Sequence, residues 1–167
     1  MIQKVWRESN GRNFENNHNE REHMENISLY IKEEQYRRSV QELLKDQTIT
    51  VVGEPNDHSY TLELVQGMEN KISVQKQNYE IKIYFREPIQ MYRGISLFLA
   101  KVQEEEFCLE ENVNFETNGI MIDCARNVVP KIETLKQYVR YLAQFGMNRL
   151  YLYLEDVIEL EEYPYWG

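Results

Sequence analysis

The stretch from residue 119 to residue 156 constrains the fold most, because it has the order strand, helix, strand with short links. "GIMIDC" holds a continuous apolar run, Ile120 to Ile122, typical of a parallel strand covered on both faces. "PKIETLKQYVRYLAQFGMN" has the spacing of an amphipathic helix, with Pro130 at its entrance and Gly146 as a C-cap. "RLYLYLED" follows as a second strand. This order predicts a right-handed βαβ unit. The helix is expected to bury a stripe of five apolar side chains: Ile132, Leu135, Val139, Leu142 and Phe145.

Residues 27–116 are predicted to form a small α+β domain that precedes this unit. "TITVVG" is a β-branched strand, and "SYTLELVQG", "NKISVQK" and "YEIKIYF" alternate apolar and polar positions with period two. Short connections around 67–70 and 76–78 predict antiparallel hairpins. A helix is expected before the first strand, within "SLYIKEEQYRRSVQELLKDQ", with four apolar residues near one face: Tyr36, Val40, Leu43 and Leu44.

A second helix, within "EPIQMYRGISLFLAKVQEEE", is expected to cover one face of the resulting sheet. Pro88 suits a first helical turn. The expected buried stripe consists of Ile89, Tyr92, Ile95, Leu99 and Val102. The Glu104–Glu106 run is interpreted as a solvated helix end rather than an acidic binding patch. The predicted fold class is therefore α+β, a small antiparallel sheet covered by helix and followed by a βαβ unit.

Composition excludes several classes of partner. The 167 residues carry a formal net charge of −9, which argues against nucleic acid and anionic membranes as partners. Residues 1–26 are polar and are expected to form a mobile tail, in which His18 and His23 are expected to be solvated, so no metal site is predicted. Two cysteines without a metal-type or disulfide spacing indicate a reducing compartment, and a cytoplasmic protein that needs no cofactor is expected.

Polar residues follow both strands of the βαβ unit. Asp123 and Arg126 come after the first strand, and Glu155 and Asp156 after the second. Ligands of α/β sheets and barrels sit beyond the carboxyl ends of the strands, so all four side chains are candidates for one cleft. The alternative is structural: Asp123 and Arg126 form an ion pair that pins the loop, and the two acidic residues cap the next segment of the chain. Spacing alone leaves both interpretations open.

The segment from Gly119 to Asp156 resembles the first βαβ unit of the barrel in the β-N-acetylhexosaminidases of glycoside hydrolase family 20. The family form is an R-G-apolar-apolar-apolar-D-x-x-R stretch, a proline, a helix, and a strand that enters with a G/K-M-N triplet and ends in Asp. Here "GIMIDCAR", Pro130, "GMN" and Asp156 occur in that order. Upstream, the strands and "PIQMYRGISLFLAKVQ" resemble the small α+β domain that precedes the family's barrel. The resemblance implies three parts: a tail (1–26), the small domain (27–116), and the first unit of an incomplete (β/α)8 barrel (117–167).

This resemblance implies an enzyme that removes terminal N-acetylhexosamine from glycans. In the family the acetamido oxygen of the substrate is the nucleophile, so the usual carboxylate nucleophile is absent. An Asp-Glu pair after the fourth barrel strand orients the acetamide and supplies the general acid. This sequence contains no Asp-Glu dipeptide, so the isolated chain is expected to be inactive and no catalytic residue is assigned. Asp123, Arg126 and Asp156 match family positions that shape or support the sugar pocket, and they are assigned to substrate binding.

Two positions depart from the family pattern. The sugar-binding arginine before the strand glycine aligns with Asn118, and a common histidine of the second strand aligns with Tyr153. The aromatic end "EEYPYWG" offers Tyr163, Tyr165 and Trp166 either for sugar stacking or as exposed core. An isolated two-strand unit also leaves an open sheet edge, so self-association is expected. The alternative to the enzyme is a free-standing α/β carbohydrate-binding or interaction module, whose βαβ unit completes the sheet of the small domain.

Overall fold

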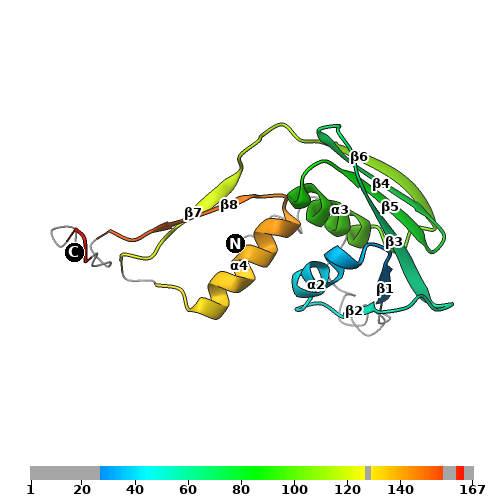
Figure 1. Ribbon diagram of the computed structural model, residues 1–167, viewed down its shortest axis with the longest axis horizontal. Helices are drawn as coiled ribbons and strands as arrows, with labels where there is room; N and C mark the ends of the chain where they lie inside the picture. Colours follow the sequence, from blue (N-terminus) through cyan, green and yellow to red (C-terminus); the bar gives the residue numbers. More distant parts are fainter. Residues whose placement is uncertain (1–26, 127–128, 156–160, 164–167) are drawn as a thin grey trace, which may run out of the picture.

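The computed structural model describes residues 27–126, 129–155 and 161–163, so the tail prediction for 1–26 lies outside the described residues. Six strands form one sheet in the order β2-β1-β3-β5-β4-β6 (Figure 1). The strands are β1 (Ile27–Ile31), β2 (Ile49–Val52), β3 (Ser59–Gln66), β4 (Lys71–Gln77), β5 (Glu80–Phe85) and β6 (Glu106–Asn112). Among the described residues, no helix is long and apolar enough to cross a membrane.

The sheet is mixed, and the prediction of an antiparallel sheet is wrong for three of its five strand pairs. β1 pairs in parallel with β2 and β3, and β3 pairs in parallel with β5. β4 runs antiparallel to both of its neighbours, β5 and β6. The hairpin around residues 76–78 is therefore confirmed, whereas the one around 67–70 is not, because β5 lies between β3 and β4. Alternation shows which face of a strand is buried, but it leaves open which neighbour the strand pairs with.

Two strands were not expected from the sequence. β1 occupies residues assigned to the start of a helix, and its Leu29 and Ile31 are fully buried. The first strand thus precedes the first helix. β6 begins at Glu106, where a solvated helix end was predicted, and it forms one edge of the sheet against β4. Its acidic residues conceal a period-two pattern in which Phe107 and Leu109 are half-buried.

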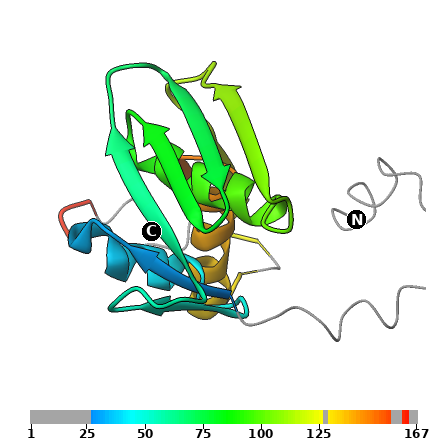
Figure 2. The ribbon, with the colours of Figure 1, turned by 90° about the vertical axis from the view of Figure 1, so that its right-hand side faces the viewer.

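Two helices cover the same face of the sheet, as Figure 2 shows by looking onto the opposite, open face. They are α2 (Glu34–Leu43) and α3 (Pro88–Ala100). Val40 and Leu43 of α2 share one buried cluster with the central strands, which confirms the predicted face of this helix. In α3 the fully buried side chains are Met91, Ile95 and Phe98. Only Ile95 of the predicted α3 stripe is fully buried, and its other four members are half-buried.

The predicted βαβ unit is confirmed. β7 (Gly119–Asp123) and β8 (Arg149–Tyr153) pair in parallel and in register, with α4 (Ile132–Gln144) between them in the chain. Gly119 allows the two strands to approach closely, since a Cβ there would lie 2.0 Å from the carbonyl oxygen of Arg149. The pair forms a separate two-stranded sheet that extends away from the six-stranded one (Figure 1). The interpretation in which this unit completes the sheet of the small domain is therefore wrong.

α4 joins the βαβ unit to the rest of the molecule by packing against α2 and α3. The Arg140 guanidinium binds the carboxylates of Glu42 and Asp46 at 3.0 and 2.8 Å. Leu142 is buried, whereas Ile132, Val139 and Phe145 are more than half exposed, so most of the predicted α4 stripe is wrong. The same holds for the predicted two-sided cover of β7, whose Met121 is 69% exposed. A two-stranded sheet is too narrow to cover a whole helix face.

Candidate functional site

The carboxyl ends of β7 and β8 bring together the polar residues that the sequence singled out. The parallel register places Asp123 opposite Tyr153, the last residues of the two strands. The pairing continues one residue further, where the backbone N–H of Cys124 donates to the Tyr153 carbonyl at 2.8 Å. This register holds Asp123, Arg126 and Glu155 at one edge of the two-stranded sheet, as predicted from their positions after the two strands. Asp156 lies outside the described residues.

The loop after β7 is shaped by Asp123. One oxygen of its carboxylate accepts a hydrogen bond from the backbone N–H of Ala125 at 2.9 Å, a local turn that aspartate commonly makes. The other oxygen lies 3.6 Å from Nε of Arg126. Arg126 is 73% exposed, and ion pairs at such positions contribute only about 0–1 kcal/mol. The backbone hydrogen bond therefore fixes the loop more than the ion pair does.

Arg126 also connects the two strand ends. Its Nη2 lies 3.8 Å from Oε2 of Glu155, and its guanidinium carbon lies 6.0 Å from the centre of the Tyr153 ring. The arginine is thus placed between two carboxylates and an aromatic face. Its donors are loosely held and largely solvent-exposed, so they are available to a polar ligand.

Tyr153 is the member of this group whose contacts the sequence did not predict. Its hydroxyl donates a hydrogen bond of 2.5 Å to Oε2 of Glu155. This bond, with smaller effects from desolvation and the Glu155 charge, raises the pKa of the Tyr153 phenol, and the nearby Arg126 opposes the rise. The sequence identified Tyr153 only as a departure from the family histidine. Its position opposite Asp123 in the strand register is the signal that would have placed it here.

The group can bind a polar, uncharged ligand through an arginine fork, two carboxylates and a tyrosine ring. The described residues contain no cluster of three metal-ligating side chains. Of the terminal aromatics, Tyr163 is half exposed, while Tyr165 and Trp166 lie outside the described residues. Asn118 lies at the opposite end of β7, where its carbonyl accepts backbone hydrogen bonds from Asn148 and Arg149.

Comparison with known proteins gives matches in structure but not in sequence. No protein-family profile and no curated protein matches the chain. Among solved structures it is similar to an inactive mutant of the family 20 exo-β-N-acetylglucosaminidase from Vibrio harveyi, with 16% identity and a TM-score of 0.59 over 83% of this chain and 24% of that one. It is also similar to the family 20 β-N-acetylhexosaminidase from Streptomyces coelicolor A3(2), with 14% identity and a TM-score of 0.58.

A mutant Streptomyces plicatus β-hexosaminidase in complex with the product GlcNAc gives the same picture, with 14% identity and a TM-score of 0.59. Both Streptomyces structures are matched over 83% of this chain and 33% of their own. The chain thus spans a quarter to a third of the length of these proteins. The expected resemblance to family 20 is confirmed at the level of the fold: this chain has the fold of part of a family 20 β-N-acetylhexosaminidase.

Proposed function

We propose that this chain is the N-terminal part of a β-N-acetylhexosaminidase-like glycoside hydrolase, in which β7, α4 and β8 begin the catalytic barrel. One observation carries the proposal. The match to a family 20 enzyme extends over 83% of the chain, which is more than either the six-stranded domain or the βαβ unit makes up alone. Two parts that match in one arrangement are stronger support than either alone, because small α+β domains and βαβ units each occur in many unrelated proteins.

The exposure of the βαβ unit also supports this proposal. Parallel strands are normally buried on both faces, yet Met121 and Tyr151 are 69% and 52% exposed, and on α4 Val139 is 52% exposed. Further strands and helices of a barrel would cover these side chains. We therefore assign the remaining barrel, with its Asp-Glu pair, to a longer protein that includes this chain.

In that protein, Asp123, Arg126 and Asp156 are proposed to line the pocket for a terminal N-acetylhexosamine. Arg126 would donate to sugar hydroxyls or to the acetamido oxygen, while Asp123 holds the loop that carries Arg126. The attacking group is the acetamido oxygen of the substrate itself, so these residues orient the sugar and transfer no proton. Their role in the proposal is binding and positioning.

The test uses the extended protein and a chromogenic N-acetyl-β-glucosaminide. Arg126→Ala is expected to raise KM at least about tenfold, because it removes a charge-assisted donor from a sugar pocket. Lys136→Ala is the matched control, since it removes an exposed cation of α4 that pairs with Glu133 one turn away. Wild-type kinetics in Arg126→Ala would show that Arg126 does not bind the sugar.

The free-standing module lacks the structural basis proposed for it. Its βαβ unit was expected to extend the sheet of the small domain, but β7 and β8 pair only with each other among the described strands.

A further inference from the structure

A cavity of about 650 Å³ lies at the end of β7 and β8 opposite to Asp123 and Arg126. It is bordered by the first turn of α3, by the connection from β6 to β7, and by the junction between α4 and β8. Asn118 and Arg149, which line it, stand at the amino ends of the two parallel strands. Its volume falls within the range of about 300–1,000 Å³ that is usual for small-molecule sites.

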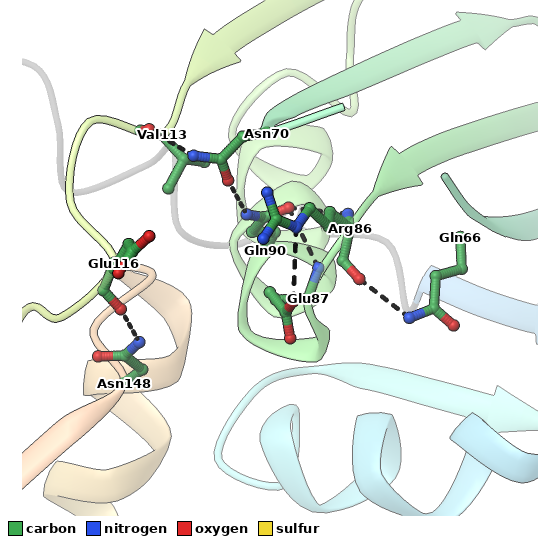
Figure 3. A network of polar contacts seen from close by, with 8 residues as sticks. All are labelled: Gln66, Asn70, Arg86, Glu87, Gln90, Val113, Glu116 and Asn148. Carbon is green, nitrogen blue, oxygen red and sulfur yellow. Dashed lines mark hydrogen bonds and ion pairs between the residues drawn. The ribbon is translucent and has the colours of Figure 1, made fainter. Parts of the chain in front are cut away.

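We call this cavity the junction pocket. Amide side chains hold its walls in place by hydrogen bonds to other residues of the chain (Figure 3). Gln90, which is 3% exposed, accepts from the backbone N–H of Arg86 at 2.8 Å and donates to Asn70 at 3.0 Å. Asn70 in turn donates to the Val113 carbonyl at 3.0 Å. On the other side Asn148 donates to the Glu116 carbonyl at 2.7 Å. The pocket is therefore formed before any ligand arrives, which lowers the entropic cost of binding.

The charges around the pocket balance. Its lining holds three arginines and three glutamates, namely Arg86, Arg93, Arg149, Glu87, Glu111 and Glu116. Arg93 is engaged in a two-pronged contact with Glu111, at 2.9 and 2.8 Å. Arg86 has a longer contact with Glu87, at 3.6 Å. A lining without net charge gives no electrostatic preference for an anion or a cation, so it favours a neutral polar ligand.

Two aromatic rings and three amides remain available in this lining. Phe115 and Phe145 are 70% and 61% exposed. The side-chain amides of Asn112, Asn114 and Asn118 are exposed and make no hydrogen bond with another described residue. Ring faces carry partial negative charge and attract the C–H groups of a sugar ring, and amides can donate to and accept from hydroxyls. This combination of flat apolar faces with neutral donors and acceptors matches the chemistry of a carbohydrate.

We propose that the junction pocket is a binding site for an uncharged saccharide. It is separate from Asp123, Arg126 and Asp156, which are assigned to the sugar pocket of the hydrolase. Phe115 and Phe145 provide the stacking surfaces, and Asn114 and Asn118 pair with hydroxyl or acetamido groups. The site binds the saccharide and catalyses no reaction. Its existence does not depend on the proposed hydrolase function, because it uses only residues of this chain.

The test is a titration of the isotope-labelled 167-residue chain with N,N′-diacetylchitobiose and with cellobiose, followed by amide chemical shifts. Saturable shifts are expected at 112–118 and 145–149 for at least one disaccharide. Phe145→Ala should weaken binding roughly three- to tenfold through loss of ring stacking. Tyr141→Ala removes an exposed ring one helical turn away, outside the pocket, and should leave the affinity unchanged.

Three results would overturn the proposal. The first is the absence of saturable shifts with either disaccharide. The second is a set of shifts confined to 123–126 and 153–155, or an affinity that is unchanged in Phe145→Ala. The third is binding of glucose 6-phosphate without binding of a neutral disaccharide, which would show that the arginines select an anion. Because Phe145 is largely exposed, its replacement leaves the core intact, and unchanged unfolding of the variant verifies this.

Discussion

At the scale of single residues, Gly94 shows how closely α3 approaches the sheet. A Cβ at this position would lie 2.5 Å from Cγ2 of Ile83 and 3.3 Å from Cγ2 of Ile72. Both isoleucines are buried and β-branched, so neither can move aside freely. Gly94→Ala is therefore expected to lower the free energy of unfolding by about 1–3 kcal/mol, despite the better helix propensity of alanine. Urea unfolding measures this loss.

Gly53 provides the control for that substitution. A Cβ there has no atom within 4 Å, so Gly53→Ala should change the free energy of unfolding by less than about 0.5 kcal/mol. An equal effect of the two replacements would contradict the close packing of α3 on β4 and β5.

The contact between Tyr153 and Glu155 predicts a late-titrating tyrosine. Because the phenol donates to a carboxylate, its pKa is raised, and the neutral form persists to higher pH in the folded protein than in the unfolded one. Any stability from this bond is present below the unfolded pKa and is lost as pH rises through the folded pKa. Ultraviolet difference titration of the wild type against Tyr153→Phe isolates this group. Glu155→Gln should lower the pKa of Tyr153, and an unchanged pKa would show that the bond is absent in solution.

At the scale of secondary-structure elements, α4 connects the two parts of the chain through Arg140. This side chain is only 12% exposed and pairs with Glu42 and Asp46 at the end of α2. Arg140→Ala leaves both carboxylates without their partner, and we expect a loss of about 1–2 kcal/mol, between the values of exposed and buried pairs. Hydrogen exchange should become faster in α4 and remain unchanged in α3.

Lys136→Ala is the matched control on the same helix. Lys136 is 58% exposed and pairs with Glu133, a contact of the kind that contributes a few tenths of a kcal/mol. If this variant speeds exchange in α4 as much as Arg140→Ala does, the ion pairs with α2 do not hold the helix.

The sequence predicted the helices and strands better than it predicted which of them pair or pack together. β2 to β5, the three helices and the βαβ order follow from local patterns, and β7, α4 and β8 lie where the "GIMIDC" and "GMN" stretches placed them. Strand pairing and helix burial depend on contacts far apart in the sequence, so the parallel β3–β5 pair and the exposure of Val139 were missed. The strand ends were predictable because a βαβ unit fixes which strand ends adjoin. The place of the Tyr153 ring beside Arg126 could be known only from the strand register.

At the scale of the whole molecule, exposed apolar side chains gather on one part. Most of the large exposed hydrophobic residues belong to the segment 120–152, including Met121, Tyr151 and Leu152 of β7 and β8. Such surfaces associate in water, so the isolated chain is predicted to self-associate as its concentration rises. Light scattering after size-exclusion chromatography should show this, and Met121→Glu should reduce it. Met68→Glu, at a 92% exposed position outside this segment, should not. A monomer at all concentrations would contradict the prediction.

We propose that this chain is part of a β-N-acetylhexosaminidase-like glycoside hydrolase. The most direct measurement compares hydrolysis of a chromogenic N-acetyl-β-glucosaminide by the 167-residue chain and by the same reading frame extended to full barrel length. We predict turnover by the extended protein only, because the chain has no Asp-Glu dipeptide to supply the acetamide-orienting and proton-donating pair. Turnover by the short chain, or its absence from both proteins, would contradict this account.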